Sequence, residues 1–158
     1  MSMRPILFLA AAFAITLSAG TVAPAANINV GASECQGNFS PGNTLVHAGI
    51  GVMTEDGEDT PQSVICAVPR ATVNGTSSTG GFYVDGDNLN GASTSCGLFS
   101  FDPDGQLAQS ASFTTAAAHY DVFLSLDVAR LNANGHITLR CMLPAHANGV
   151  LRGVTSVQ

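Results

Sequence analysis

The sequence has 158 residues, of which 11 are acidic and 5 are basic, so its formal net charge is −6. This length fits one ordinary domain preceded by a short leader. A surface so poor in cations repels phosphate backbones and anionic lipids, which excludes nucleic acid from the expected partners.

Residues 1–25 have the organisation of a secretory signal peptide. A positive charge at Arg4 precedes an uncharged apolar run at 6–17, and an A-x-A cleavage sequence follows at 23–25. The apolar run is too short to span a membrane, and nothing later in the chain is long enough. We therefore expect an exported protein, periplasmic or extracellular, with one mature domain at 26–158 and no integral membrane segment. Because Arg4 leaves with the leader, the mature net charge would be −7.

The mature chain alternates apolar and polar residues in short segments separated by turn signals such as Asp102–Gly105 and Asn132–Gly135. The alternating segments lie, in chain order, at 45–54, 63–69, 80–86, 93–101, 107–115, 120–131, 135–144 and 149–157. Alternation with a period of two predicts half-buried antiparallel strands, and no segment after the leader has a helical period. The pattern predicts an all-β fold: an antiparallel β-sandwich of about eight short strands, with a small β-barrel as the alternative.

Two of these segments repeat nearly the same phrase, SVICAVPRA at Ser63–Ala71 and TLRCMLPAH at Thr138–His146. In each, a cysteine lies on the apolar face and a proline ends the run, because proline cannot continue a β-ladder. Each phrase also follows an earlier cysteine, so the chain divides into two halves. The cysteines are Cys35, Cys66, Cys96 and Cys141. Of the three connectivities open to an exported chain, we expect Cys35–Cys66 and Cys96–Cys141, each contributing roughly 3–4 kcal/mol.

The strand patterns V-x-C-x-V-P-R, here Val64–Arg70, and L-x-C-x-L-P, here Leu139–Pro144, resemble those of a loosely defined group of uncharacterised exported bacterial proteins. The resemblance covers most of the mature chain. It implies a disulfide-stapled fold and brings no known activity with it.

Residues able to bind a metal are present, but their spacing fits no established motif. In CMLPAH, Cys141 and His146 have the residue types of a blue-copper loop, with His47 as an upstream ligand. However, no methionine follows His146, and Cys141 is needed for a disulfide. Segment 85–91, DGDNLNG, fails the calcium-loop register because Leu89 occupies the fifth position.

The remaining metal candidates are the histidines and the acidic loop TEDGEDT. These residues are His47, His119, His136, His146, Glu55, Asp56, Glu58 and Asp59. Because His47 and His136 fall on the polar faces of their strands, we interpret them as surface residues. Acidic hairpin loops are usually solvated in the same way, so no metal or other cofactor is expected.

The sequence carries no catalytic motif. It lacks a G-x-S-x-G elbow, and the His and Asp of HYD at 119–121 are explained by the strand pleat. The absence of tryptophan, with only Tyr83 and Tyr120 as tyrosines, disfavours sugar binding by stacking.

Two functional hypotheses follow. The first is a non-enzymatic exported β-sandwich that serves as a binding, surface or structural module. The second is a secreted hydrolase or metal-binding protein, which would need several His, Asp or Glu side chains to converge on one pocket. In either case, an edge strand could accept a strand from a protein partner.

Overall fold

The computed structural model describes residues 27–37, 45–69, 80–127, 130–131 and 135–157. The expected signal peptide lies outside these residues, as does most of the turn expected at Asn132–Gly135. Over the described ranges, no helix has the length and hydropathy needed to cross a membrane.

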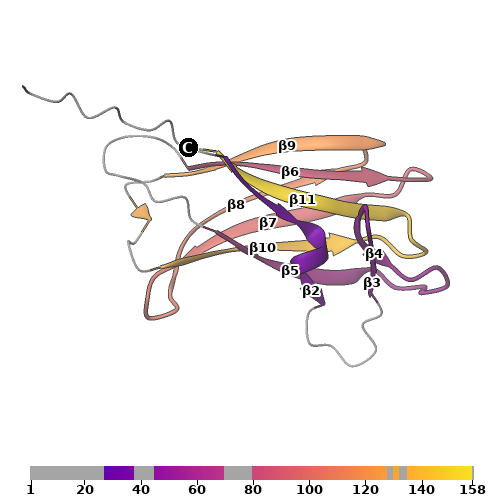
Figure 1. Cartoon of the computed structure of the whole chain (residues 1–158), viewed down its shortest axis with the longest axis horizontal. Helices are drawn as coiled ribbons and strands as arrows, with labels where there is room; N and C mark the ends of the chain where they lie inside the picture. Colours follow the sequence, from indigo (N-terminus) through magenta and orange to yellow (C-terminus); the bar gives the residue numbers. More distant parts are fainter. Residues whose placement is uncertain (1–26, 38–44, 70–79, 128–129, 132–134, 158) are drawn as a thin grey trace, which may run out of the picture.

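The described chain folds into two antiparallel sheets that pack face to face as a β-sandwich, as the sequence predicts (Figure 1). The six-stranded sheet has the order β3-β4-β11-β6-β9, and β1 also pairs with β11. Its strands are β1 (Ile28–Gly31), β3 (Leu45–Ala48), β4 (Gly51–Thr54), β6 (Gly80–Asn88), β9 (His119–Leu126) and β11 (Gly149–Val157). A 3-10 turn, η1 (Ala32–Glu34), follows β1.

The five-stranded sheet has the order β2-β5-β10-β7-β8. Its strands are β2 (Gln36–Gly37), β5 (Gln62–Val68), β7 (Thr94–Phe101), β8 (Leu107–Thr115) and β10 (His136–Leu143). Both sheets direct every second side chain inward, and the fully buried core between them is aliphatic. It includes Val52, Val64, Val84, Leu98, Leu139, Leu143 and Leu151. Burial of such side chains is the main favourable contribution to folding.

The two repeated phrases lie side by side, because β5 and β10 pair antiparallel with Leu139 opposite Cys66. Both strands end one residue before a proline, Pro69 or Pro144. The structure contains the disulfides Cys35–Cys66 and Cys96–Cys141, the pairing expected from the sequence. The two halves of the chain are not separate units, however, since strands from both build each sheet.

Two segments differ from the sequence prediction. Residues 45–54 form a tight hairpin, β3 and β4, because the chain turns at 49–50 and Gly51 has a φ of 148°. Only glycine adopts this conformation without strain. Strand β9 ends at Leu126 rather than at residue 131. The N–H of the next residue, Asp127, donates a hydrogen bond to the side-chain oxygen of Gln109 at 2.9 Å.

Candidate functional site

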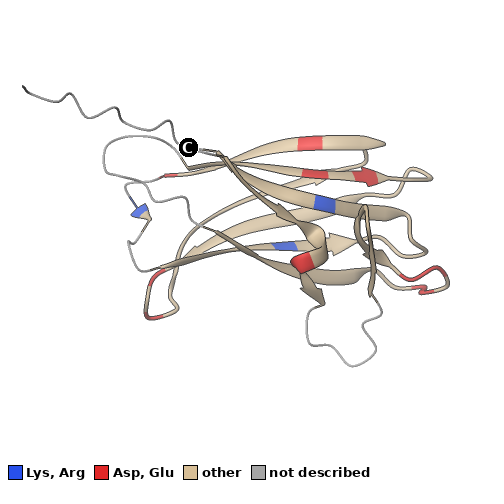
Figure 2. Ribbon diagram, viewed as in Figure 1, with Lys and Arg blue, Asp and Glu red and all other residues tan. Residues whose placement is uncertain are grey.

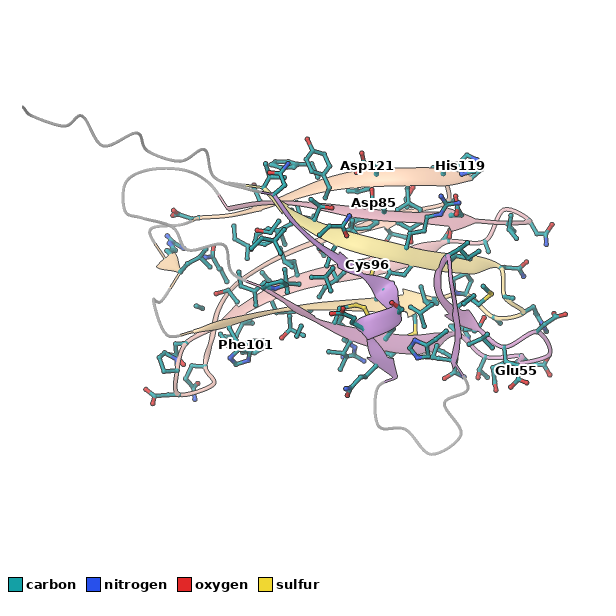
Figure 3. All side chains as sticks on the ribbon, in the orientation of Figure 1. Glu55, Asp85, Cys96, Phe101, His119 and Asp121 are labelled. Atoms are coloured by element: carbon teal, nitrogen blue, oxygen red, sulfur yellow. A yellow bond between two sulfur atoms is a disulfide. The ribbon has the colours of Figure 1, made fainter. Side chains whose placement is uncertain are left out.

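The outer face of the six-stranded sheet carries three successive cross-strand pairs on β6 and β9, which we call the three rungs. They are the aromatic rung Tyr83–Phe123, the acidic rung Asp85–Asp121 and the ion-paired rung Asp87–His119. Directly opposite residues on neighbouring strands have Cβ atoms about 5 Å apart, and rungs two residues apart lie about 7 Å apart. Acidic side chains accordingly gather on these two strands (Figures 2 and 3).

The acidic rung joins two carboxyl groups on an exposed face. Burial raises the pKa of Asp85 above 3.8; its hydrogen bond with Asp121 and the negative charge of Asp121 raise this pKa further. Arg152 acts in the opposite direction. Two carboxylates this close repel each other when both are ionised, so the rung favours a shared proton or a cation between them.

The ion-paired rung is compensated from within the protein. Asp87 is only 8% exposed, and its carboxylate contacts the Nδ1 of His119 and accepts a hydrogen bond from the Nε of Arg152 at 2.6 Å. Arg152 is the extra residue of β11 at this point, where the register opposite β6 shifts between Leu151 and Gly153 in a β-bulge. Bulges of this kind redirect side chains near the edges of functional surfaces. Asp87 is therefore paired with Arg152, the only arginine on this face of the described sheet.

The aromatic rung lies next to the acidic one and is exposed to solvent. The rings of Tyr83 and Phe123 have centroids 5.1 Å apart and are tilted by 54°, and the two residues are 38% and 51% exposed. The Phe123 ring lies over Gly81, where a Cβ atom would be 2.6 Å from the ring. An exposed aromatic pair offers apolar area and negative ring faces to a ligand.

A buried tyrosine supports the acidic and ion-paired rungs from below. Tyr120 points into the sandwich beneath Gly86, and its hydroxyl donates a hydrogen bond to the carbonyl oxygen of Val150 at 3.4 Å. Burial raises the pKa of Tyr120 to about 12. This phenol stays neutral at physiological pH and serves to pack the sheet.

The structure separates most of the metal candidates proposed from the sequence. His119 belongs to the ion-paired rung, whereas His136 stacks on Phe101 with ring centroids 4.9 Å apart. The exposed His47 lies on the short edge strand β3. None of the described residues form a group of three or more His, Cys, Asp or Glu side chains arranged to hold a metal ion.

Several of those candidates contact one another at the loop between β4 and β5. The Nε2 of His146 lies 3.4 Å from a carboxylate oxygen of Asp59, and the His146 N–H donates to the carbonyl oxygen of Glu58. These contacts hold the loop after β10 against the loop between β4 and β5. Glu55 and Asp56 lie in the latter loop, at one end of the sandwich (Figure 3).

The sequence interpretation gave no site role to four residues of the rungs or to the arginine that contacts them: Tyr83, Asp85, Asp87, Phe123 and Arg152. It placed Asp121 on the polar face of its strand and assigned no partner. The missing information was the pairing of β6 with β9, which are separated by two strands in the chain. The alternation of 80–86 and 120–126 showed which residues face outward but could not show that they face each other.

The outer face of the five-stranded sheet has a different character. A shallow depression of about 340 Å³ lies over Gly97, with Phe99 and Arg140 among its lining residues. The rest of its lining includes the hydroxyl groups of Ser95, Ser112 and Thr114. The Nε of Arg140 donates to Ser63 on the neighbouring strand β5 at 3.0 Å.

The chain matches no protein-family model and no curated protein sequence. Several solved structures are similar in architecture. An exo-β-1,3-galactanase from Phanerochaete chrysosporium, with galactose, aligns at 12% identity and a TM-score of 0.49 over 84% of this chain. An isomalto-dextranase from Arthrobacter globiformis T6, complexed with panose, aligns at 15% identity and a TM-score of 0.45 over 82%.

The chain spans only 30% and 23% of those two enzymes. A family 35 carbohydrate-binding module from Clostridium thermocellum aligns at 13% identity and a TM-score of 0.44, over 85% of this chain and 99% of the module. At these identities the likeness concerns the β-sandwich alone. The function must be argued from the residues of this chain.

Proposed function

We propose that the protein is an exported, non-enzymatic binding module that uses the three rungs to hold a cationic side chain of a protein partner, lysine or arginine. The observation that carries the proposal is the acidic rung, in which Asp85 and Asp121 lie directly opposite each other on neighbouring strands beside an exposed aromatic pair. The two disulfides support export, because such bonds persist in oxidising compartments.

The charges of the face favour a cationic ligand. Arg152 is engaged by Asp87, and its opposing effect on Asp85 does not outweigh burial and Asp121, so the pKa of Asp85 remains raised. An ammonium or guanidinium group placed between the carboxylates would donate to both and relieve their repulsion. The aromatic rung next to it would then contact the aliphatic stem or the charged group of the same side chain.

The hydrolase hypothesis is less well supported by the same geometry. Glycoside hydrolases separate their two carboxyl groups by about 5 Å or more, which leaves room for the sugar carbon and a nucleophile. Asp85 and Asp121 are direct cross-strand neighbours, and their interaction raises the pKa of Asp85. They also lie on an exposed sheet face, whereas catalytic pairs use an enclosed site to exclude water.

The test is a calorimetric titration of the mature, oxidised protein with a capped tetra-arginine peptide. We expect binding that weakens as salt is added, because exposed charges are screened. Asp121→Asn should weaken it roughly tenfold, the expected effect of losing one charge-assisted hydrogen bond. The matched control is Asp104→Asn, which removes the same charge from the exposed loop between β7 and β8 and should leave affinity nearly unchanged.

Two results would contradict the proposal. Equal losses in Asp121→Asn and Asp104→Asn would show a general attraction between a basic peptide and an acidic protein. Equal binding of a capped tetra-glutamine peptide, insensitive to salt, would show that the face recognises neutral hydrogen-bond donors instead.

A further inference from the structure

The lateral edges of the two sheets are protected to different degrees. Unpaired edge strands expose N–H and C=O groups that can pair with another chain, and proteins protect them by shortness, charge, proline or bulges. Three edges of the described sandwich are protected in this way. One edge of the six-stranded sheet is formed by β1 and β3, which have four residues each, and its other edge, β9, carries His119 and Asp121. In the five-stranded sheet, the edge strand β2 has only two residues.

Strand β8 is the exception. It runs for nine residues, LAQSASFTT, without a charged residue or a proline, and in the described sheet it pairs only with β7. Its outward-facing side chains are small and hydroxylic: Ser110, Ser112 and Thr114 are all exposed. Such a strand is long enough, and free enough of repulsion, to accept another strand along its whole length.

The inward-facing side chains of β8 give independent evidence that this edge is open. Ala111 and Phe113 pack against the core but stay partly exposed. On β9, the edge strand of the other sheet on the same side, Val122 is also partly exposed, whereas Leu124 and Leu126 are 6% and 2% exposed. The described core is therefore incompletely covered on this side of the sandwich, and β8 is its longer, uncharged edge.

We propose that β8 is the interface through which two copies of this chain associate, by antiparallel β8–β8 pairing about a two-fold axis. An isologous contact places the same strand on both sides, so its own character decides whether it is compatible with itself. A strand without charge meets no repulsion from its copy, and facing serine and threonine side chains form favourable cross-strand pairs. Pairing would join the two five-stranded sheets and extend cover over Phe113.

The charge distribution explains why this edge suits a copy of the same chain. The acidic groups of the described residues lie on β6, β9, η1 and the loops, so an acidic protein repels its copy at most approaches (Figure 2). The middle of β8 is a direction of approach that brings no like charges together. The contact is independent of the three rungs, which lie on the outer face of the other sheet.

The experiment is native mass spectrometry of the mature, oxidised protein over a range of concentrations up to millimolar. We expect a species of twice the protomer mass for the wild type. Ser112→Lys should weaken the association at least about tenfold, because pairing along the whole of β8 places this central residue close to its copy. The control Ser125→Lys adds the same charge at an exposed serine of the β9 edge and should still dimerise.

Amide hydrogen exchange gives a second readout that needs no variant. Exchange of residues 107–115 should slow as the wild-type concentration rises, while exchange of β9 stays constant. A wild type that remains monomeric at millimolar concentration would overturn the proposal and leave the edge to a strand from another protein. A dimer that persists in Ser112→Lys, with no change in exchange at β8, would also overturn it.

Discussion

The outer faces of the two sheets differ far more than their inner faces do. Inside, both sheets present the same aliphatic alternation. Outside, the six-stranded sheet carries three acidic groups, a histidine and an arginine on neighbouring strands, beside an exposed aromatic pair. The five-stranded sheet carries hydroxyl groups, half-buried rings and the single arginine Arg140.

The difference indicates that the inner faces serve packing, whereas the outer faces can carry residues that bind a partner. The inner faces satisfy packing, and any well-filled aliphatic layer does so. The acidic rung does not stabilise the fold by itself, since Asp121 and burial both raise the pKa of Asp85. Groups that carry such a cost are candidates for a role in binding.

The largest expected effect on stability concerns Gly86, on the inner face of the six-stranded sheet, compared with Gly97, on the outer face of the five-stranded sheet. A Cβ at Gly86 would collide with the buried Tyr120 hydroxyl and with the carbonyl oxygen of Val150, neither of which can move freely. We expect Gly86→Ala to lower the free energy of unfolding by about 3 kcal/mol, the upper range for overpacking.

The comparison variant is Gly97→Ala on the other sheet. Its Cβ would lie 2.7 Å from the far end of the partly exposed Phe99 ring, which can swing aside. A loss below about 1 kcal/mol is expected in chemical unfolding, since the clash is relieved by a side-chain rotation. Similar losses in both variants would mean that the two faces tolerate added volume equally.

An intermediate effect is expected from the two arginines on the outer faces. Arg152→Gln leaves the nearly buried Asp87 carboxylate without its guanidinium, and we expect a loss of about 2 kcal/mol, as for a hydrogen bond to a charged group. Arg140→Gln removes one exposed contact with Ser63 and should cost less than about 0.5 kcal/mol. Thermal unfolding of both variants measures the difference between the two losses of stability. Equal losses would show that the contact of Arg152 with Asp87 stabilises the fold no more than the exposed contact of Arg140 does.

The smallest effect concerns the pH dependence of Asp85. Because its pKa is raised in the folded protein, the stability it contributes is present below its ordinary pKa and is lost as pH rises through the folded value. Acidification from neutral pH should therefore stabilise the wild type relative to Asp85→Asn. Chemical unfolding of both proteins over a pH series checks the sign, and the opposite slope would show that the fold stabilises the Asp85 carboxylate.

The fold was predictable because alternation reports directly on burial. The alternating segments, including 80–86 and 107–115, all contribute strands, and Pro69 and Pro144 directly follow strand ends. The hairpin at 45–54 was missed because its residues keep one alternation through the turn. Two glycines around Ile50 were the available signal, since they permit the turn conformation.

The candidate site was not predictable to the same extent. His119 and Asp121 were noticed as neighbours in the chain, yet His119 contacts Asp87 from another strand. Such pairs depend on strand order, which alternation does not encode. The contact of Arg152 with Asp87 likewise depends on the register of β11 against β6.

The most direct test of the account is amide chemical-shift mapping of the mature, oxidised protein with the capped tetra-arginine peptide. The account predicts that the perturbed residues cluster on β6 and β9 around Asp85 and Asp121, and that Asp121→Asn moves the titration of these shifts to a roughly tenfold higher peptide concentration. Perturbations centred on the outer face of the five-stranded sheet, or spread evenly over the acidic loops, would contradict it.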